Sequence, residues 1–263
     1  MTPPAGAAAG SGAWAARQDA AAHAFVAALD DTVEISGADG HHLQRVRRLG
    51  AGEHMTLADG AGTWRRYAIE SVAPGRLRLG AVSDAVTEPE IVPRVVLAVA
   101  LTKAGALETV VTRGTELGIA RFIPMRTRRC VVRWTPAQAE RAVARLQVTA
   151  REAAAQSRRA RVPEVSAVAD LVSVAGLSGL VVAEPGGLPA REIPAPVQRV
   201  PPAVDWIVAV GPEGGFDPAE LEAMREAPRV SLGPHILRAE TAPIAVSVLF
   251  LDRARELFRE WHV

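Results

Sequence analysis

The chain has 263 residues, of which 49% are hydrophobic and 22% are charged, and its formal net charge is +1. This composition is typical of a globular protein with one large domain or two modest ones and excludes a disordered chain. The single cysteine, Cys130, excludes a disulfide framework and a cysteine-based zinc cluster. We interpret it as a buried structural residue rather than a nucleophile, in a reducing cytoplasm. No apolar run approaches the roughly 18 residues of a membrane span, so the sequence predicts no transmembrane helix and no membrane partner.

The first part of the chain carries the pattern of a small β domain. Residues 1–20 are rich in Ala, Gly and Pro and lack the basic segment of a signal peptide, so we expect a disordered extension. From residue 21 to 88, short apolar runs are separated by turn signals such as Asp59-Gly60 and Pro74-Gly75. This pattern predicts a small β-barrel-like module with one short helix, Asp39–Leu49. The expected strands lie at 24–26, 32–35, 54–57, 64–72 and 76–82.

The remainder of the chain alternates between strands and helices. The acidic, proline-containing segment Asp84–Pro93 is the predicted connector, and residues 89–263 form the predicted second domain. Continuous apolar strands that alternate with helices are typical of a parallel α/β sheet with both faces covered. We expect strands at 95–100, 122–124, 180–183, 206–210 and 229–233, and helices at 107–117, 135–159 and 244–258.

A glycine-rich turn follows the apolar strand Trp206–Val210. The turn, Gly211–Gly215, leads into a helix for which Asp217 is a good N-cap and Glu220 a capping-box partner. Ligands of parallel sheets bind at the carboxyl ends of strands, where such turns lie. The turn lacks the dinucleotide and Walker A patterns. By itself it is equally compatible with a ligand site and with a tight connection that binds nothing.

A second loop of the same kind favours the ligand. After the strand at 229–233, an irregular segment carries Arg238, Glu240 and Thr241 before an apolar helix begins, with Thr241 as its expected N-cap and Pro243 in its first turn. Two successive loops can enclose a nucleoside between main-chain donors and acceptors. An adenosyl ligand suits such a pocket.

The two loops resemble the cofactor motifs of the RsmE family, SPOUT-class methyltransferases that methylate N3 of a uridine in 16S ribosomal RNA. The resemblance is carried by Val210–Phe216 and Leu232–Ala242, and it extends over roughly residues 23–260. Further matching segments are His41–Leu49, Lys103, Thr115–Gly118, Pro124, Arg129, Val131-Val132, Glu152-Ala153 and Gln156-Ser157.

This resemblance implies an α/β SPOUT domain with a trefoil knot, preceded by a PUA-like RNA-binding β-barrel. It also implies S-adenosyl-L-methionine as cofactor, 16S rRNA of the small ribosomal subunit as partner, and a homodimer formed through the C-terminal helix region. The cofactor-binding residues that it implies are Ala183, Glu184, Gly211, Pro212, Glu213, Gly214, Gly215, Leu232, Gly233, Ile236, Leu237, Arg238, Thr241 and Ala242.

The charge of the chain is unevenly distributed. Residues 121–161 contain eleven arginines and only two acidic residues, Glu140 and Glu152, which is a net charge of +9. Such a segment attracts phosphate groups, although a solvated helix face in an arginine-rich protein would have the same composition. The residues predicted to bind RNA are Arg45, Arg47, Arg48, Lys103, Arg128, Arg129, Arg158 and Arg159.

The catalytic hypothesis concerns the second loop. Attack by a uracil nitrogen on a methyl sulfonium requires loss of the N3 proton and alignment of three atoms. We expect Arg238 to stabilise the developing uracil anion, and Glu240 to orient Arg238 or accept the proton. Glu213 is interpreted as a brace for its loop. Adjacent His41 and His42 lack the partners of a metal site, so no metal is predicted. The alternatives are another SPOUT target, such as a ribose hydroxyl, and a non-catalytic RNA-binding protein of ribosome assembly.

Overall fold

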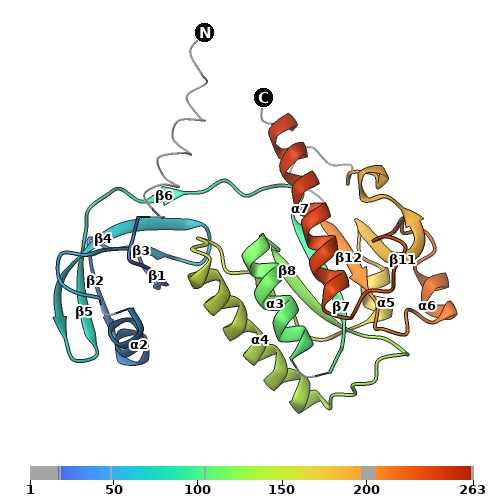
Figure 1. Cartoon of the computed structure of the whole chain (residues 1–263), viewed down its shortest axis with the longest axis horizontal. Coiled ribbons are helices and arrows are strands. Elements are labelled where there is room, and N and C mark those ends of the chain that lie inside the picture. The colour runs from blue at the N-terminus through green and yellow to red at the C-terminus, as the bar shows by residue number, and fades with distance from the viewer. Residues whose placement is uncertain (1–16, 18, 48, 104, 197–204, 262–263) are drawn as a thin grey trace, which may run out of the picture. The chain divides into compact units, whose positions relative to one another are not determined.

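The computed structural model describes residues 17, 19–47, 49–103, 105–196 and 205–261 (Figure 1). The chain forms two compact units. The first contains residues up to Pro89 together with Ala154–Val162, and the second contains Glu90–Ala153 and Pro163–Val263. Almost all of the predicted extension lies outside the described residues. No helix in the described part of the chain is long and apolar enough to cross a membrane.

The first unit is built on an open, curled sheet. Its strands follow the order β1 (Ala22–Phe25), β3 (His54–Ala58), β4 (Thr63–Ala73), β5 (Arg76–Ala81) and β2 (Thr32–Ser36). The short β6 (Val86–Thr87) pairs with β4, and helix α2 (Gly37–Arg47) follows β2 directly. The small β domain is confirmed, but no pairing among its described strands joins β1 to β2. The sheet is therefore a curled half-barrel, which agrees with the PUA-like, barrel-like domain expected from the sequence.

Alternation along the strands explains this sheet. In β5, Leu77 and Leu79 are fully buried, while Arg76 and Arg78 point away and pair with carboxylates of neighbouring strands. Met55, Leu57, Tyr67 and Ile69 complete the apolar core. Apolar side chains at every second position are thus buried on one face of the sheet, as the alternating polar and apolar sequence requires.

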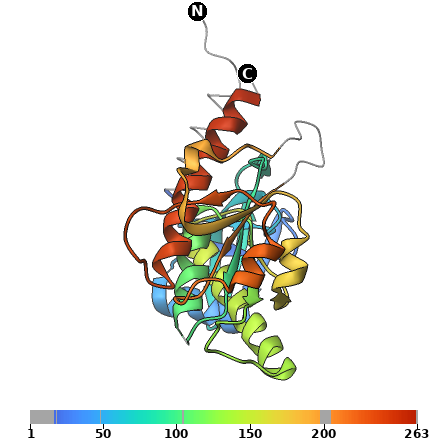
Figure 2. The same ribbon diagram turned by 90° about the vertical axis from the view of Figure 1, so that its right-hand side faces the viewer.

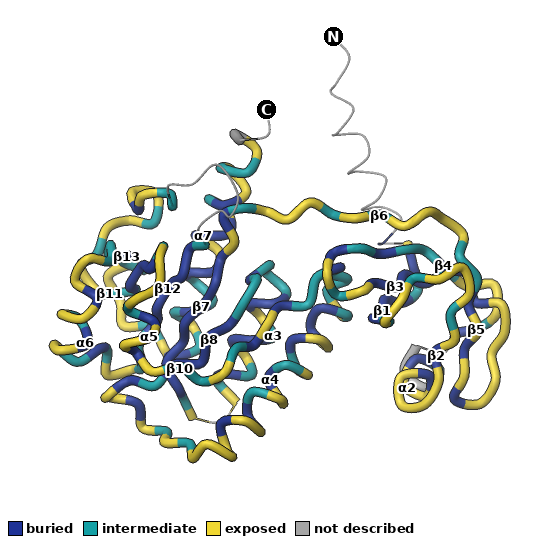
Figure 3. Tube along the Cα trace, turned by 180° about the vertical axis from the view of Figure 1, so that it is seen from behind, coloured by how far each residue is buried: buried dark blue, intermediate teal, exposed yellow. Residues whose placement is uncertain are grey.

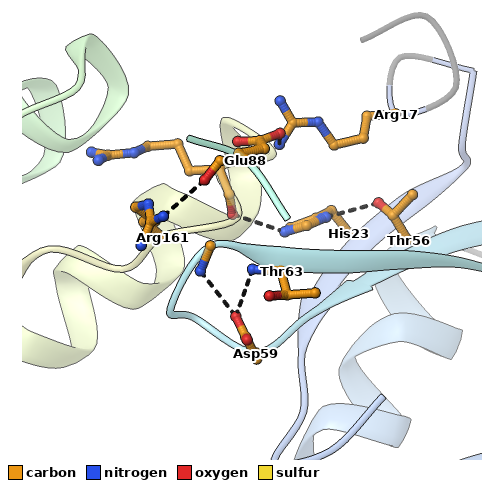
Figure 4. Close-up of polar contacts among 9 residues, drawn as sticks. Arg17, His23, Thr56, Asp59, Thr63, Glu88 and Arg161 are labelled. Carbon is orange, nitrogen blue, oxygen red and sulfur yellow. Dashed lines mark hydrogen bonds and ion pairs between the residues drawn. The ribbon is translucent and has the colours of Figure 1, made fainter. Parts of the chain in front are cut away.

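The segment Ala154–Val162 lies against the half-barrel although it is distant from it in sequence (Figure 4). The buried imidazole of His23 bonds to the hydroxyl of Thr56 at 2.8 Å and to the carbonyl oxygen of Arg159 at 3.0 Å. The Arg161 guanidinium donates to the carbonyl oxygens of Ala61 and Glu88. These bonds place Ala154–Val162 inside the polar network of the first unit.

The second unit contains a parallel sheet, as predicted. Its order is β10 (Ala169–Asp170), β8 (Arg121–Arg126), β7 (Val95–Ala100), β12 (Trp206–Val210), β11 (Leu180–Leu188) and β13 (Arg229–Val230), and β9 (Glu164–Val165) pairs with β8. Every pairing in this sheet is parallel. The knotted threading implied by the family resemblance stays a prediction.

Helices cover both faces of this sheet. Helices α3 (Ala106–Leu117), α4 (Pro136–Gln156) and α7 (Thr241–Trp261) share one core with alternate strand residues such as Val99 and Val208. The short helices α5 (Leu171–Ala175) and α6 (Pro218–Ala223) belong to the opposite core, with Ala98 and Ala209. Figure 2 shows α7 in red on one side of the sheet and α6 in orange on the other. The central strands are buried along their whole length (Figure 3), which explains their continuous apolar sequences.

Several element ends differ from the prediction. Helix α4 stops at Gln156 instead of Arg159 because Arg158 takes the left-handed backbone conformation, with φ 58°. Strand β11 continues to Leu188 through an irregularity after Ala183, where Gly186 has φ 80°. Strand β13 ends at Val230 instead of Gly233. Helix α7 begins at Thr241, and a 3-10 turn spans Ala190–Glu192.

Candidate functional site

Strand register brings the two predicted loops to one edge of the sheet. Ala183 of β11 is paired with Val210 of β12 and with Val230 of β13, and Val99 of β7 is paired with Val210 on the other side. Because all these strands are parallel, the segments that follow them emerge at the same edge. The glycine turn, Gly211–Gly215, therefore lies between the segments that follow β7 and β11.

A cavity of about 400 Å³ lies at this edge, lined by the segments that follow β11, β12 and β13 and by Arg129. Thirteen of the fourteen residues predicted to bind the cofactor line it, and Thr241 does not: the lining predicted residues are Ala183, Glu184, Gly211, Pro212, Glu213, Gly214, Gly215, Leu232, Gly233, Ile236, Leu237, Arg238 and Ala242. Of the other lining residues, Val210, Phe216, Pro234, His235 and Ala239 lie within the two predicted motifs, and only Arg129 and Pro185 were not indicated for this site by the sequence. Its volume is within the usual range for a small-molecule site.

The glycine turn is shaped by main-chain geometry. The Gly215 N–H donates to the Pro212 carbonyl oxygen at 2.8 Å, and Gly215 has φ 68°, which glycine adopts without strain. At Gly211, a Cβ atom would lie 3.2 Å from the buried Phe216 ring. A side chain at Gly211 would thus crowd the Phe216 ring, and the glycine there leaves the main chain of the turn accessible to a ligand.

The start of helix α6 has the predicted capping box. The Asp217 carboxylate accepts from the Ala219 N–H at 3.1 Å, and the Glu220 carboxylate accepts from the Asp217 N–H at 2.8 Å. Pro218 occupies the first turn, where its missing N–H has no cost. The capping box fixes the direction in which the chain leaves the glycine turn.

The second loop ends with main-chain capping of α7. The Arg238 carbonyl oxygen accepts from the N–H groups of Thr241 and Ala242 at 3.0 and 3.1 Å. Thr241 is the first helical residue rather than the cap, and Pro243 lies in the first turn as expected. The Arg238 side chain is exposed, and Ile236 is 95% exposed. Within the described part of the chain, no hydrogen bond or ion pair joins the Arg238 side chain to Glu240.

The loop between β8 and α4, residues 127–134, is named here the arginine loop. It carries three exposed arginines, Arg128, Arg129 and Arg133. The Arg129 guanidinium donates to the carbonyl oxygen of Gly214 at 2.8 Å, so the arginine loop contacts the glycine turn directly. Sequence reasoning assigned Arg129 to RNA alone. Its place beside the cavity arises from a contact over 85 positions, for which no local pattern exists.

The other residues predicted to bind RNA lie in different settings. Lys103 is exposed just beyond the carboxyl end of β7. Arg158 donates to the Arg17 carbonyl oxygen, and the Arg159 carbonyl accepts from His23, so both belong to the network of the first unit. Helix α2 contains Arg45 and Arg47, whose side chains lie outside the described residues, as does all of Arg48.

Cys130 is buried, as interpreted from the sequence, and its Sγ lies 3.1 Å from the Thr127 hydroxyl. No group of three or more His, Cys, Asp or Glu side chains in the described part of the chain is arranged to hold a metal ion.

Comparison with known proteins matches both parts of the chain. Residues 89–250 match the RNA methyltransferase domain family, and residues 35–80 match the RNA methyltransferase PUA domain family. The first match covers more than half of the chain and includes every loop of the cavity.

Curated relatives and solved structures resemble most of the chain. It is 34% identical over 232 residues to the ribosomal RNA small subunit methyltransferase E of Mycobacterium bovis, which covers 83% of this chain and 86% of that protein. It is 32% identical over 222 residues to the protein of the same name from Bacillus subtilis, covering 81% and 87% of the two chains. A Legionella pneumophila protein, solved with the bound cofactor S-adenosylmethionine, has a TM-score of 0.73 and 25% identity, with 89% and 97% of the chains covered.

Proposed function

Because the chain belongs to the ribosomal RNA small subunit methyltransferase E family, we propose that it methylates N3 of a uridine in 16S ribosomal RNA with S-adenosyl-L-methionine as methyl donor. The observation that carries the proposal is the cavity at the sheet edge, which is lined by both family motifs. The half-barrel of the first unit, which matches a PUA domain of RNA methyltransferases, supports RNA as the substrate.

The residues present fit the cofactor. The main chain of the glycine turn approaches the cavity without an intervening side chain at Gly211, and a Cβ there would meet the Phe216 ring. Ala183, Leu232 and Ala242 offer apolar surface that packs against the core. These groups would hold an adenosyl moiety between main-chain polar atoms and apolar side chains. The Legionella protein of the same fold was solved with this cofactor.

The chain itself has to position the uridine and assist loss of its N3 proton. When bound, the cofactor supplies an electrophilic methyl group. Arg238 lines the cavity with an exposed guanidinium and is free to face an incoming base, where its charge would stabilise the developing uracil anion. Glu240 lies two residues later and serves as proton acceptor or as orienting partner once RNA is bound. Catalysis thus consists largely of alignment together with one stabilising charge.

The assembly proposed for the protein is a homodimer in the cytoplasm. Helix α7 exposes Val248 and Leu249 beside Leu117 and Arg191, and these residues line a surface cavity of about 440 Å³. Apolar side chains at such a place are suited to burial against a second copy. Light scattering of the purified protein measures its mass in solution, and a monomeric mass would contradict the dimer.

The deciding experiment uses small ribosomal subunits from a strain that lacks this gene. Incubation with the purified protein and S-adenosylmethionine, followed by mass mapping of the rRNA, should reveal one added methyl group on a uracil base. A methyl group on a ribose would indicate another target within the same enzyme class. Absence of any methyl transfer, together with no heat on titration with S-adenosylmethionine, would favour a purely RNA-binding protein.

A further inference from the structure

Glu220 is a buried carboxylate that the capping box only half explains. Its side chain belongs to a residue only 6% exposed, on the first turn of helix α6. One oxygen, Oε2, accepts from the Asp217 N–H at 2.8 Å, which closes the capping box. The other, Oε1, accepts at 2.7 Å from the N–H of Arg128, a residue 92 positions away in the arginine loop. The two oxygens therefore join two different loops.

The chemistry of this pair of bonds requires a carboxylate. A capping box alone accepts either Glu or Gln at this position, because only one oxygen is used. A Gln side chain has one oxygen and one NH2 group, and the NH2 would face a second N–H donor. Glu220 can accept from both N–H groups at once, and charged acceptors make the stronger hydrogen bonds. The second bond thus distinguishes this residue from an ordinary helix cap.

Two further contacts reinforce the same junction. The Arg129 guanidinium donates to the Gly214 carbonyl oxygen at 2.8 Å, and the Arg128 guanidinium lies 3.4 Å from the Asp217 carboxylate. The aliphatic part of Arg129 also runs over Gly214, where a Cβ atom would be 3.7 Å from its Cδ. The arginine loop is therefore held at two further points, by Gly214 in the glycine turn and by Asp217 at the start of α6.

We infer that Glu220 is a positioning residue for RNA: it holds the arginine loop against the glycine turn, so that Arg128 and Arg129 meet the RNA backbone beside the cofactor cavity. The inference rests on the proposed function. A guanidinium has five N–H donors, and Arg129 uses one of them on Gly214. The others remain available to a phosphate group while the bond to the turn is kept. Glu220 itself is buried and does not contact RNA.

The test compares E220Q with the wild type and with E222Q. Glu222 lies on the same helix but is exposed, and among the described residues its side chain pairs only with Arg225, so E222Q controls for the loss of one negative charge. For E220Q we expect the KM for small-subunit rRNA to rise about tenfold, as expected from loss of one charge-assisted hydrogen bond. The Kd for S-adenosylmethionine and kcat at saturating RNA should stay within about threefold of the wild type, since all lining residues of the cavity except Arg129 lie outside the arginine loop. E222Q should match the wild type in all three quantities.

A second variant, R129A, keeps the inference testable if E220Q unfolds. Arg129 is exposed, so its truncation should leave the melting temperature unchanged and raise the KM for RNA in the same way. In E220Q/R129A the two effects should be less than additive, because both act through one loop. An unchanged KM for RNA in R129A, or equal increases in RNA KM and cofactor Kd in E220Q, would overturn the inference. A wild-type protein that methylates no rRNA would instead refute the proposed function.

Discussion

The imidazole Nε2 of His23 donates a hydrogen bond of 3.0 Å to the carbonyl oxygen of Arg159, a residue 136 positions further along the chain (Figure 4). Because a carbonyl only accepts, Nε2 carries the proton and Nδ1 is left to accept from the Thr56 hydroxyl at 2.8 Å. In the neutral imidazole, both ring nitrogens are therefore hydrogen-bonded. Burial is the main cause that lowers the pKa of His23 from 6.5 to about 4, and the charges of Arg17 and Arg158 act in the same direction.

The stability of the first unit should therefore depend on His23 at mildly acidic pH. The folded pKa lies below the unfolded value, so the native state binds fewer protons than the unfolded chain between them. The contribution of the neutral ring is complete above pH 6.5, declines as the pH falls, and is lost at about pH 4. A shift of this size corresponds to roughly 3 kcal/mol. Urea unfolding at pH 7, 5.5 and 4.5 measures it, and H23Q should show a flatter dependence than the wild type. H42Q, at an exposed position, is the control, and equal slopes in all three proteins would contradict the prediction.

Truncation of Arg238 should impair catalysis more than cofactor binding. R238A removes the exposed guanidinium but keeps the carbonyl that caps α7, so the second loop should retain its conformation. Loss of one charge-stabilising donor lowers kcat by about 100- to 1000-fold in other enzymes. We expect a decrease of that order in single-turnover methyl transfer, with the Kd for S-adenosylmethionine within about threefold. H235A, in the same loop, should transfer methyl groups nearly as fast as the wild type. Full activity of R238A would remove Arg238 from the mechanism.

A side chain at Gly187 should lower the stability of the second unit. A Cβ atom at this position would lie 2.7 Å from the main-chain carbonyl of Arg229, where β11 passes β13. G187A should lose about 2 kcal/mol of stability because rigid backbone cannot move aside cheaply. The second loop begins just after β13, so the affinity for S-adenosylmethionine should fall as well. At Gly176, by contrast, a Cβ would only reach ordinary contact at 3.8 Å, and G176A should change stability by less than about 0.5 kcal/mol. Equal melting temperatures for both variants would contradict this reading of the β11–β13 contact.

Lys103 should contribute a single phosphate contact to RNA binding. It is exposed beyond the carboxyl end of β7, beside the strand that leads to the glycine turn. For K103A, the slope of log Kd against log salt should decrease by about 0.7–0.9, the value for one neutralised phosphate. R225A removes a cation that is already paired with Glu222 and Glu226, so its slope should equal that of the wild type. Fluorescence anisotropy with an rRNA fragment at several salt concentrations measures both slopes.

Periodicity and turn chemistry were sufficient to predict most elements but not all of their ends. Continuous apolar runs marked β7 and β12 because both faces of those strands are buried. The end of α4 was predicted too late, since the periodicity of the helix does not indicate that Arg158 takes the left-handed backbone conformation. The continuation of β11 through Gly186 and Gly187 was likewise missed. Consecutive glycines are typical of a loop, and these belong to a strand only because of their contact with β13.

The lining residues that could be predicted are those that come directly after a strand in the sequence. Gly211 and Leu232 could be assigned because the carboxyl ends of parallel strands share an edge. Contacts between loops could not be assigned in this way. The bonds from Glu220 to Arg128 and from Arg129 to Gly214 join segments 85 to 92 positions apart, and each involves a main-chain atom, whose identity no sequence pattern encodes.

The position of Ala154–Val162 has a consequence for biosynthesis. The strands of the half-barrel lie before Pro89, but the carbonyl that accepts the hydrogen bond from His23 belongs to Arg159. At ribosomal rates of about 5–20 residues per second, the 73 residues between Pro89 and Val162 take roughly 4–15 s to synthesise. During that interval the nascent half-barrel exposes His23 and the partners of Arg161, and chaperones have access to them. The first unit is therefore complete only after β7 and β8, the first two strands of the second unit, have been translated.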